Sequence, residues 1–235
     1  DFGAGQGRII ENLNGQYSDL AQKVSDSIDY VAFDKYPSYE TICRASITGA
    51  FGSSDDRYFS AGDKLREVHG DNNFDVIVMC NVLHEIPPES WLDYFGPSGL
   101  FEKLLSESGY LLIVEDQHIP VGEQAYEEGF LVLDTEQLKV LFCVTPEDTG
   151  FQIANSTLGG RLKAHLIPGN LLKNYNLDRI EPTVHSLKKQ AREEIRRIRK
   201  KGDRFQDGLL HAFWVHQLAN AELIIERIQP QTRGS

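Results

Sequence analysis

Glycine occupies every second position at the start of this chain, directly before a helical pattern. Asp1 opens the run, and the three glycines are Gly3, Gly5 and Gly7. Glycine lets the backbone adopt positive φ and approach a ligand closely because it carries no Cβ atom. The helix that follows would direct its first backbone amides at the same ligand. These residue types indicate a nucleotide-binding turn, with an ordinary tight strand-to-helix turn as the alternative.

The same stretch lacks two familiar phosphate-binding motifs. The dinucleotide fingerprint Gly-x-Gly-x-x-Gly requires glycine where this chain has Arg8. A P-loop requires Gly-Lys-Ser/Thr, which does not occur here. The glycine spacing therefore excludes both of these sites.

A carboxylate follows the next apolar run of the chain. Asp34 comes directly after residues 30–33, which predict a strand. A carboxylate at the carboxyl end of a strand can accept hydrogen bonds from both hydroxyls of a ribose. A helix cap or a solvated turn is the alternative role for this acid. Combined with the glycine turn, Asp34 favours binding of a nucleoside.

Two further strand ends carry groups that could move a proton. The loop 81–88 follows the clearest predicted strand and contains His84 and Glu85. His84 could act as a general base because its ordinary pKa lies near neutrality, or it could only pack on a ligand or cap a turn. Glu115 and Asp116 end the next strand. Since neighbouring side chains of a strand point to opposite faces, at most one of these two acids faces an acceptor.

The run Asp-x-Gly-x-Gly-x-Gly at residues 1–7 resembles the first motif of class I S-adenosylmethionine-dependent methyltransferases. The segment 81–88 is similar to a Val-Leu-His-x-Ile/Leu-Pro loop found in many small-molecule and quinone-type members. In that family the glycine turn passes under the methionine and ribose of the cofactor, and the loop closes over the methionine end. The family also places an acid or polar residue near the adenine amino group, where this chain has Asp63. Asp63 could instead cap the short helix that follows it.

The resemblance implies a set of site residues and S-adenosyl-L-methionine as the cofactor. The residues expected to bind the cofactor are Asp1, Gly3, Gly5, Gly7, Asp34, Lys35, Gly62, Asp63, Asn81 and Val82. The residues expected to take part in catalysis are His84, Glu85 and Glu115. No metal is expected, because the cysteines stand far apart without nearby histidine pairs.

The alternation of short apolar runs and helical patterns up to about residue 115 predicts an α/β fold. The resemblance implies a three-layer Rossmann-like sandwich with a seven-stranded, mostly parallel sheet whose last strand is antiparallel. We expect one domain over residues 1–170 and a C-terminal helical hairpin within 171–235. Because a glycine turn of this kind follows a strand, we also expect the polypeptide to continue upstream of Asp1.

Composition narrows the compartment and the partners. The net charge of −11 disfavours non-specific binding of nucleic acid, and no apolar run is long enough to span a membrane. Three dispersed cysteines fit a reducing, cytoplasmic location. One basic stretch, from Lys188 to Arg204, contains nine Lys and Arg against three acids. It predicts a solvated helix face, or a contact with RNA or an acidic protein.

These observations predict a methyltransferase that acts on an oxygen or nitrogen atom of an unidentified acceptor. The alternative is a methyltransferase-fold domain of a larger protein that binds the cofactor or serves as a scaffold without catalysis. A small molecule or protein is expected as the acceptor, because the Asn/Asp-Pro-Pro-Tyr/Phe and Pro-Cys signatures of nucleic-acid methylation are absent. The apolar C-terminal helices predict contact with another copy or with an upstream domain. The side chains expected at that interface are Phe213, Trp214, Leu218 and Ile225.

Overall fold

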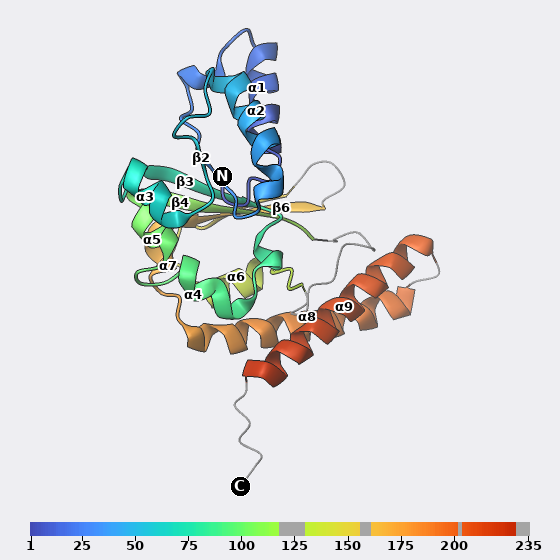
Figure 1. Cartoon of the computed structure of the whole chain (residues 1–235). Coiled ribbons are helices and arrows are strands. Elements are labelled where there is room, and N and C mark those ends of the chain that lie inside the picture. The colour runs from blue at the N-terminus through green and yellow to red at the C-terminus, as the bar shows by residue number, and fades with distance from the viewer. Residues whose placement is uncertain (118–129, 156–160, 202–203, 229–235) are drawn as a thin grey trace.

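A computed structural model describes residues 1–117, 130–155, 161–201 and 204–228. The α/β class is confirmed, with helices on both sides of a central layer of strands (Figure 1). In that view α1 and α2 lie on one side of the strands, and α4, α6 and α8 lie on the other.

Strands and helical segments alternate along the chain as far as β4. The strands are β1 Ala32–Phe33, β2 Tyr58–Phe59, β3 Phe74–Cys80, β4 Leu105–Asp116, β5 Gln152–Asn155 and β6 Leu162–Pro168. The helices are α1 Arg8–Asp19, α2 Glu40–Phe51, α3 Gly62–His69, α4 Trp91–Tyr94, α5 Leu100–Leu104, α6 Thr135–Leu141, α7 Gly169–Leu172, α8 Ile180–Lys201 and α9 Phe205–Ile228.

The strands form two sheets rather than the single seven-stranded sheet that we predicted. In the described part of the chain, β1 pairs with β2 in parallel, and a four-stranded sheet has the order β3-β4-β6-β5. Strand β3 is parallel to β4, whereas β6 is antiparallel to both β4 and β5. Phe2 makes single parallel bridges to Phe33 and Met79 and so lies between the two sheets. The prediction of seven strands was wrong because only Asp1 and Phe2 precede Gly3, and one bridging residue does not make a strand.

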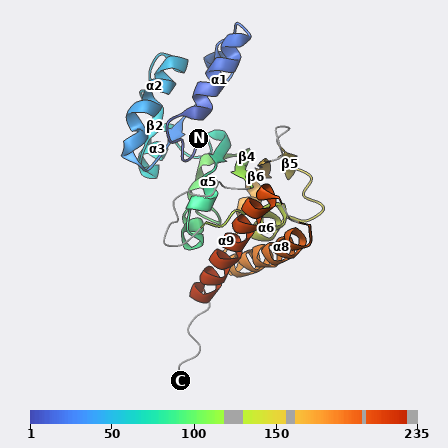
Figure 2. The ribbon, with the colours of Figure 1, turned by 90° about the vertical axis from the view of Figure 1, so that its right-hand side faces the viewer.

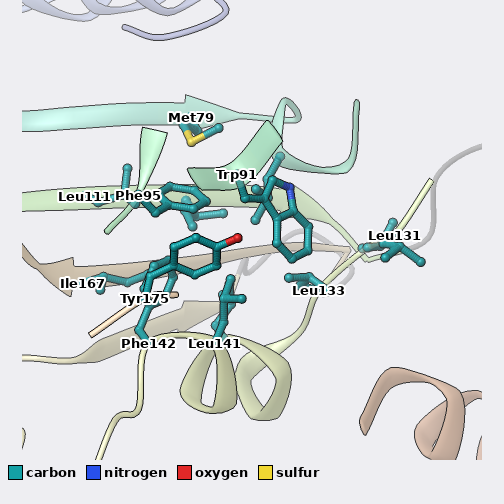
Figure 3. Packing of buried hydrophobic residues seen from close by; sticks show 14 of the residues in the cluster. Met79, Trp91, Phe95, Leu111, Leu131, Leu133, Leu141, Phe142, Ile167 and Tyr175 are labelled. Atoms are coloured by element: carbon teal, nitrogen blue, oxygen red, sulfur yellow. The ribbon is translucent and has the colours of Figure 1, made fainter. Parts of the chain in front are cut away.

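A large apolar core fills the space between the four-stranded sheet and the helices below it (Figure 3). Alternate residues of β4 enter this core: Leu111 and Ile113 are fully buried, in keeping with the two-residue period of a strand. The rings of Phe95 and Phe142 meet edge to face with their centroids 5.3 Å apart, a favoured aromatic geometry. The core therefore fixes β4, whose carboxyl end carries Glu115.

The two C-terminal helices belong to the same core. Val184, Leu187 and Ala191 of α8 are fully buried in one cluster with the residues of β3 and β4. Phe213 and Trp214 of α9 are only 7% and 9% exposed. The side chains that we expected at an interface thus pack within their own chain. Within the described ranges, none of the helices has both the length and the hydropathy of a membrane span.

Candidate functional site

Two adjoining cavities lie at the glycine turn. The smaller, of about 150 Å³, is lined by Phe2, Gly3, Gly5, Phe33, Asp34, Lys35, Tyr36, Tyr39, Asn81, Val82, Glu85, Ile86 and Tyr94. The larger, of about 380 Å³, is lined by Asp1, Gly3, Ala4, Gly5, Gln6, Arg8, Ile9, Tyr39, Cys80 and Asn81. Both cavities open where β1 and β3 end, which is the edge at which open α/β sheets bind ligands.

Each glycine of the turn has positive φ, and their surroundings differ. A Cβ atom at Gly3 would lie 2.5 Å from Val82 Cγ2, so this position brings the turn against the loop after β3. A Cβ atom at Gly5 would meet nothing within 4 Å, because Gly5 faces the cavities. At Gly7 it would lie 3.2 Å from Cys43 Sγ of α2. Gly5 is thus the position where the turn offers bare backbone to a ligand, whereas Gly7 serves helix packing.

Asp34 ties the glycine turn to the segment after β1. Its Oδ2 accepts a hydrogen bond of 2.7 Å from the Gly5 amide, and its Oδ1 accepts one of 2.8 Å from the Tyr36 amide. The side chain is only 5% exposed. Burial, and then the negative charge of Asp34, raise the pKa of the Cys43 thiol to about 11 and that of Tyr58 to about 12. The Cys43 thiol and the Tyr58 hydroxyl therefore stay neutral at physiological pH.

Asn81 joins the ends of the two central strands. It adopts a positive φ of 55°, which asparagine tolerates better than most residues. Its amide donates to the Val114 carbonyl at 2.8 Å, and its Oδ1 accepts from the Asp116 amide at 2.8 Å. These bonds fix the start of the loop that contains Val82, which lines the smaller cavity.

His84 and Glu115 form a buried pair behind this loop. His84 Nδ1 lies 2.6 Å from Glu115 Oε2, and the Leu83 amide donates to Glu115 Oε1 at 2.9 Å. The two residues are 4% and 1% exposed. Asp116 points the other way and pairs with Arg161 at 2.5 Å, as the alternation of a strand requires. An ionised Glu115 can only accept, so it selects the tautomer with the proton on Nδ1 and makes Nε2 the basic ring atom.

The segment that follows residue 129 completes the surroundings of His84. The Phe130 ring lies edge-on to the imidazole, with the ring centroids 5.3 Å apart. Helix α9 holds this segment: Gln217 Oε1 accepts from the Val132 amide at 2.9 Å, and Asn220 Nδ2 donates to the Phe130 carbonyl at 2.9 Å. The environment of His84 thus depends on residues far along the chain.

Not all of the expected site residues line the two cavities. Asp1, Gly3, Gly5, Asp34, Lys35, Asn81, Val82 and Glu85 line one or both, whereas Gly7, Gly62, Asp63, His84 and Glu115 line neither. Gly62 packs against Leu100, where a Cβ atom would lie 3.3 Å from Cδ2. Asp63 is exposed in the first turn of α3, and it is not the cap of that helix because the cap position is Ala61.

Aromatic residues of the smaller cavity were not identified from the sequence. Tyr36 and Tyr39 follow Asp34 closely, and Tyr94 ends α4. Burial raises the pKa of Tyr94 above its usual value. A signal was present in the run Tyr-Pro-Ser-Tyr, which begins two residues after the strand-end acid Asp34, because residues at one strand end share one edge of the sheet.

Comparison with family models, with curated proteins and with solved structures finds no match to this chain. Among the residues that the structure describes, no group of three or more His, Cys, Asp and Glu side chains is arranged to hold a metal ion.

Proposed function

We propose that this chain is a class I methyltransferase that uses S-adenosyl-L-methionine to methylate an oxygen or nitrogen atom. The observation that carries the proposal is the meeting of the glycine turn, Asp34 and the Asn81–Val82 segment around one cavity. These three segments lie far apart in the sequence, and each carries residue types that suit a nucleoside. Their proximity fits a ligand that combines a ribose with a flat base and a flexible tail.

The arrangement of the strands supports the same proposal. The two sheets have the orders β2-β1 and β3-β4-β6-β5, and Phe2 bridges from β1 to β3. The pairs β1-β2 and β3-β4 are parallel, whereas β6 is antiparallel to both strands beside it. This fits the three-layer Rossmann-like sandwich with an antiparallel last strand that the resemblance implies.

The residues at the turn suit such a cofactor. Gly5 leaves open space in front of its backbone, which a side chain would fill. Each oxygen of Asp34 already accepts one hydrogen bond from a backbone amide. A carboxylate oxygen can accept a second hydrogen bond, which here could come from a ribose hydroxyl. Tyr36, Tyr39 and Tyr94 offer ring surface in the same cavity. Lys35, beside Asp34, adds a cation at the cavity wall.

The bound cofactor supplies an activated methyl group, and the task of the chain is to position the acceptor and to manage its proton. Orientation of two bound reactants can lower a barrier by roughly 7–11 kcal/mol. In this proposal His84 Nε2 takes the acceptor proton, while Glu115 holds the ring through Nδ1. Glu85 lines the cavity and could orient the acceptor.

One observation favours the alternative of cofactor binding without catalysis. His84 is 4% exposed and lines neither cavity, so its imidazole could serve only to anchor the loop 81–88. In that case the chain is a cofactor-binding or scaffold domain. Binding of the cofactor without methyl transfer to any acceptor would favour this alternative.

The proposal is tested by calorimetry with S-adenosylhomocysteine and with NAD. We expect saturable binding of the first and no comparable binding of the second. Gly5→Ala is expected to weaken the binding of S-adenosylhomocysteine at least tenfold, because the added methyl group enters the cavity. The proposal would be overturned if the parent chain failed to bind S-adenosylhomocysteine, or if the Gly5→Ala variant bound it as tightly as the parent.

A matched control separates this effect from backbone strain. Gly52 also has positive φ and open space around a built Cβ atom, but it ends α2 and lines neither cavity. Both substitutions force alanine into a left-handed conformation, at a cost of about 1–2 kcal/mol in stability. Gly52→Ala should therefore lose as much stability as Gly5→Ala and keep the affinity of the parent.

A further inference from the structure

Helix α9 carries a second stripe, of five apolar residues and one histidine, outside the face that is buried in its own core. Six positions spaced alternately by four and three residues make up this stripe, which we call the outer stripe: Phe205, Leu209, Ala212, His216, Ala219 and Leu223. At 3.6 residues per turn they lie within about 80° of one another around the helix axis. Phe205 is 79% exposed and Leu223 is 58% exposed.

The opposite face of α9 is already covered. Its buried residues are Phe213, Trp214, Gln217, Ala221, Ile224 and Ile225. Figure 1 shows α9 crossing in front of α8, and Figure 2 shows the two helices side by side. A helix that is apolar on both faces is typical of one that is covered on both sides.

Charge limits what can cover the outer stripe. Residues 208–221 contain no Asp, Glu, Lys or Arg, so this surface offers nothing to an acidic protein or a nucleic acid. An interfacial membrane helix has Lys and Arg on the face opposite its apolar face, but here that opposite face is buried in the core. A second neutral, apolar helix fits the surface best.

We propose that a second copy of this chain packs its α9 antiparallel against the outer stripe. The alternating spacing of four and three is that of a coiled-coil seam. An antiparallel alignment places Phe205 against Leu223 of the second copy, Leu209 against Ala219, and Ala212 against His216. The layers combine Phe with Leu, Leu with Ala, and Ala with His, so no layer consists of two alanines or of two histidines.

A parallel alignment serves the same residues poorly. It would place each residue against its own copy, so that two layers would contain only alanines and one would contain two histidines. The larger Leu and Phe side chains would hold the two helices apart, so a cavity would remain at each alanine layer. The antiparallel alignment also opposes the two helix dipoles and brings Arg204 within reach of Glu226 of the second copy.

Sedimentation velocity of the full chain across a wide range of concentrations tests the proposal. We expect a reversible species of twice the 26.5 kDa chain mass. Leu209→Lys should weaken this dimer at least about tenfold, because it buries an ammonium group in the seam. Leu20→Lys, at a side chain that is 68% exposed next to α1, is the matched control and should leave the dimer unchanged.

A charge pair tests the direction of packing. In the double variant Leu209→Lys with Ala219→Glu, the new ammonium of one copy faces the new carboxylate of the other across an antiparallel seam. The affinity of the dimer should therefore recover. The two positions are ten residues apart and cannot pair within one helix. Should Leu209→Lys fail to fold, Leu223→Glu repeats the disruption at a more exposed position. A monomeric parent, a dimer indifferent to these substitutions, or a double variant without recovery overturns the proposal.

Discussion

One histidine outside the candidate site is expected to make the stability of this chain depend on pH. His165 of β6 is fully buried, and its Nε2 lies 2.9 Å from Thr135 Oγ1. Burial lowers the pKa of His165 from 6.5 to about 4, although the nearby Asp134 acts in the opposite direction. The imidazole is therefore neutral in the folded chain at physiological pH.

We expect the free energy of unfolding to fall between pH 6.5 and about 4 because of His165. His165 has the higher pKa in the unfolded chain, so as the pH falls the unfolded chain binds this proton before the folded chain does. The free energy of unfolding is therefore unaffected by His165 above the unfolded pKa and decreases as the pH approaches the folded pKa. The loss amounts to roughly 3 kcal/mol at most. Urea unfolding across this range should show a flatter profile for His165→Gln than for the parent. Parallel profiles would contradict this role of His165.

At the scale of single residues, the sequence predicted which side chains lie at the candidate site better than it predicted which side chains they contact. Asp34 was selected because it ends a strand, and it lines the smaller cavity. The pairing of His84 with Glu115 was not foreseen, because it joins the loop after β3 to the end of β4. Which face of β4 meets that loop depends on the register of the sheet, which single residues do not encode.

At the scale of elements, β3 was the most predictable strand, because its apolar residues form a nearly continuous run before the loop 81–88. The structure buries only Ile77 and Met79 of this strand, so the run marks a strand without marking a sheet covered on both faces. Strand β1 spans two residues, half of the predicted run 30–33, and β2 also spans two. They pair with one another, and β1 has only Phe2 on its other side. Pairing therefore limited their lengths more than composition did.

Helix α9 acts on the candidate site through Gln217. This side chain is 2% exposed and bonds to both the Val132 amide and the Phe130 carbonyl. We expect Gln217→Leu to lose about 1–3 kcal/mol of stability, because the Val132 amide is left buried without its acceptor. The resonances of the His84 ring should also shift, since the Phe130 ring lies against it.

The measurements are urea unfolding and the NMR spectrum of the imidazole protons. Gln206→Leu, on an exposed part of the same helix, is the matched control and should leave both unchanged. A Gln217→Leu variant that keeps the stability and the His84 resonances of the parent would show that α9 does not position this segment.

At the scale of the whole molecule, the C-terminal helices are part of one folding unit with the sheet. Nine large apolar side chains of α8 and α9 are buried, namely Ile180, Val184, Leu187, Ile195, Ile198, Phe213, Trp214, Ile224 and Ile225. They belong to the cluster that contains β3, β4 and α6. The spacing of apolar residues predicted these helices from the sequence. It could not predict which surface they cover, because an amphipathic pattern shows that a face is buried but not what it packs against.

A chain cut after Ile180 is therefore expected to lose cooperative unfolding. The cut removes eight of these nine side chains, because Ile180 remains. Each contributes roughly 1.5–3 kcal/mol on burial, so the gross loss of about 12–24 kcal/mol is as large as the roughly 5–15 kcal/mol that stabilises a typical domain. Near-ultraviolet circular dichroism should show the loss of fixed aromatic packing. A truncated chain with a sharp thermal transition near that of the parent would show that residues 1–180 fold alone.

The basic stretch from Lys188 to Arg204 is partly used within this unit. Glu222 of α9 lies 2.6 Å from Lys188 Nζ and 3.0 Å from Arg192 Nη2. These ion pairs join α8 to α9 and are worth about 0.2–1 kcal/mol each where solvent reaches them. They remove two of the nine cations from the face that an acidic partner could contact.

The two hydrogen bonds that Asp34 accepts from backbone amides also affect how quickly a ligand can bind. They hold the glycine turn and the segment after β1 together without help from any ligand. The entropy of ordering these loops is then lost during folding, and little remains to be lost on association. A ligand would meet a site that already has its shape, so its entry would be limited by diffusion and orientation. Differences in affinity among related ligands would then arise mainly from how long each one stays.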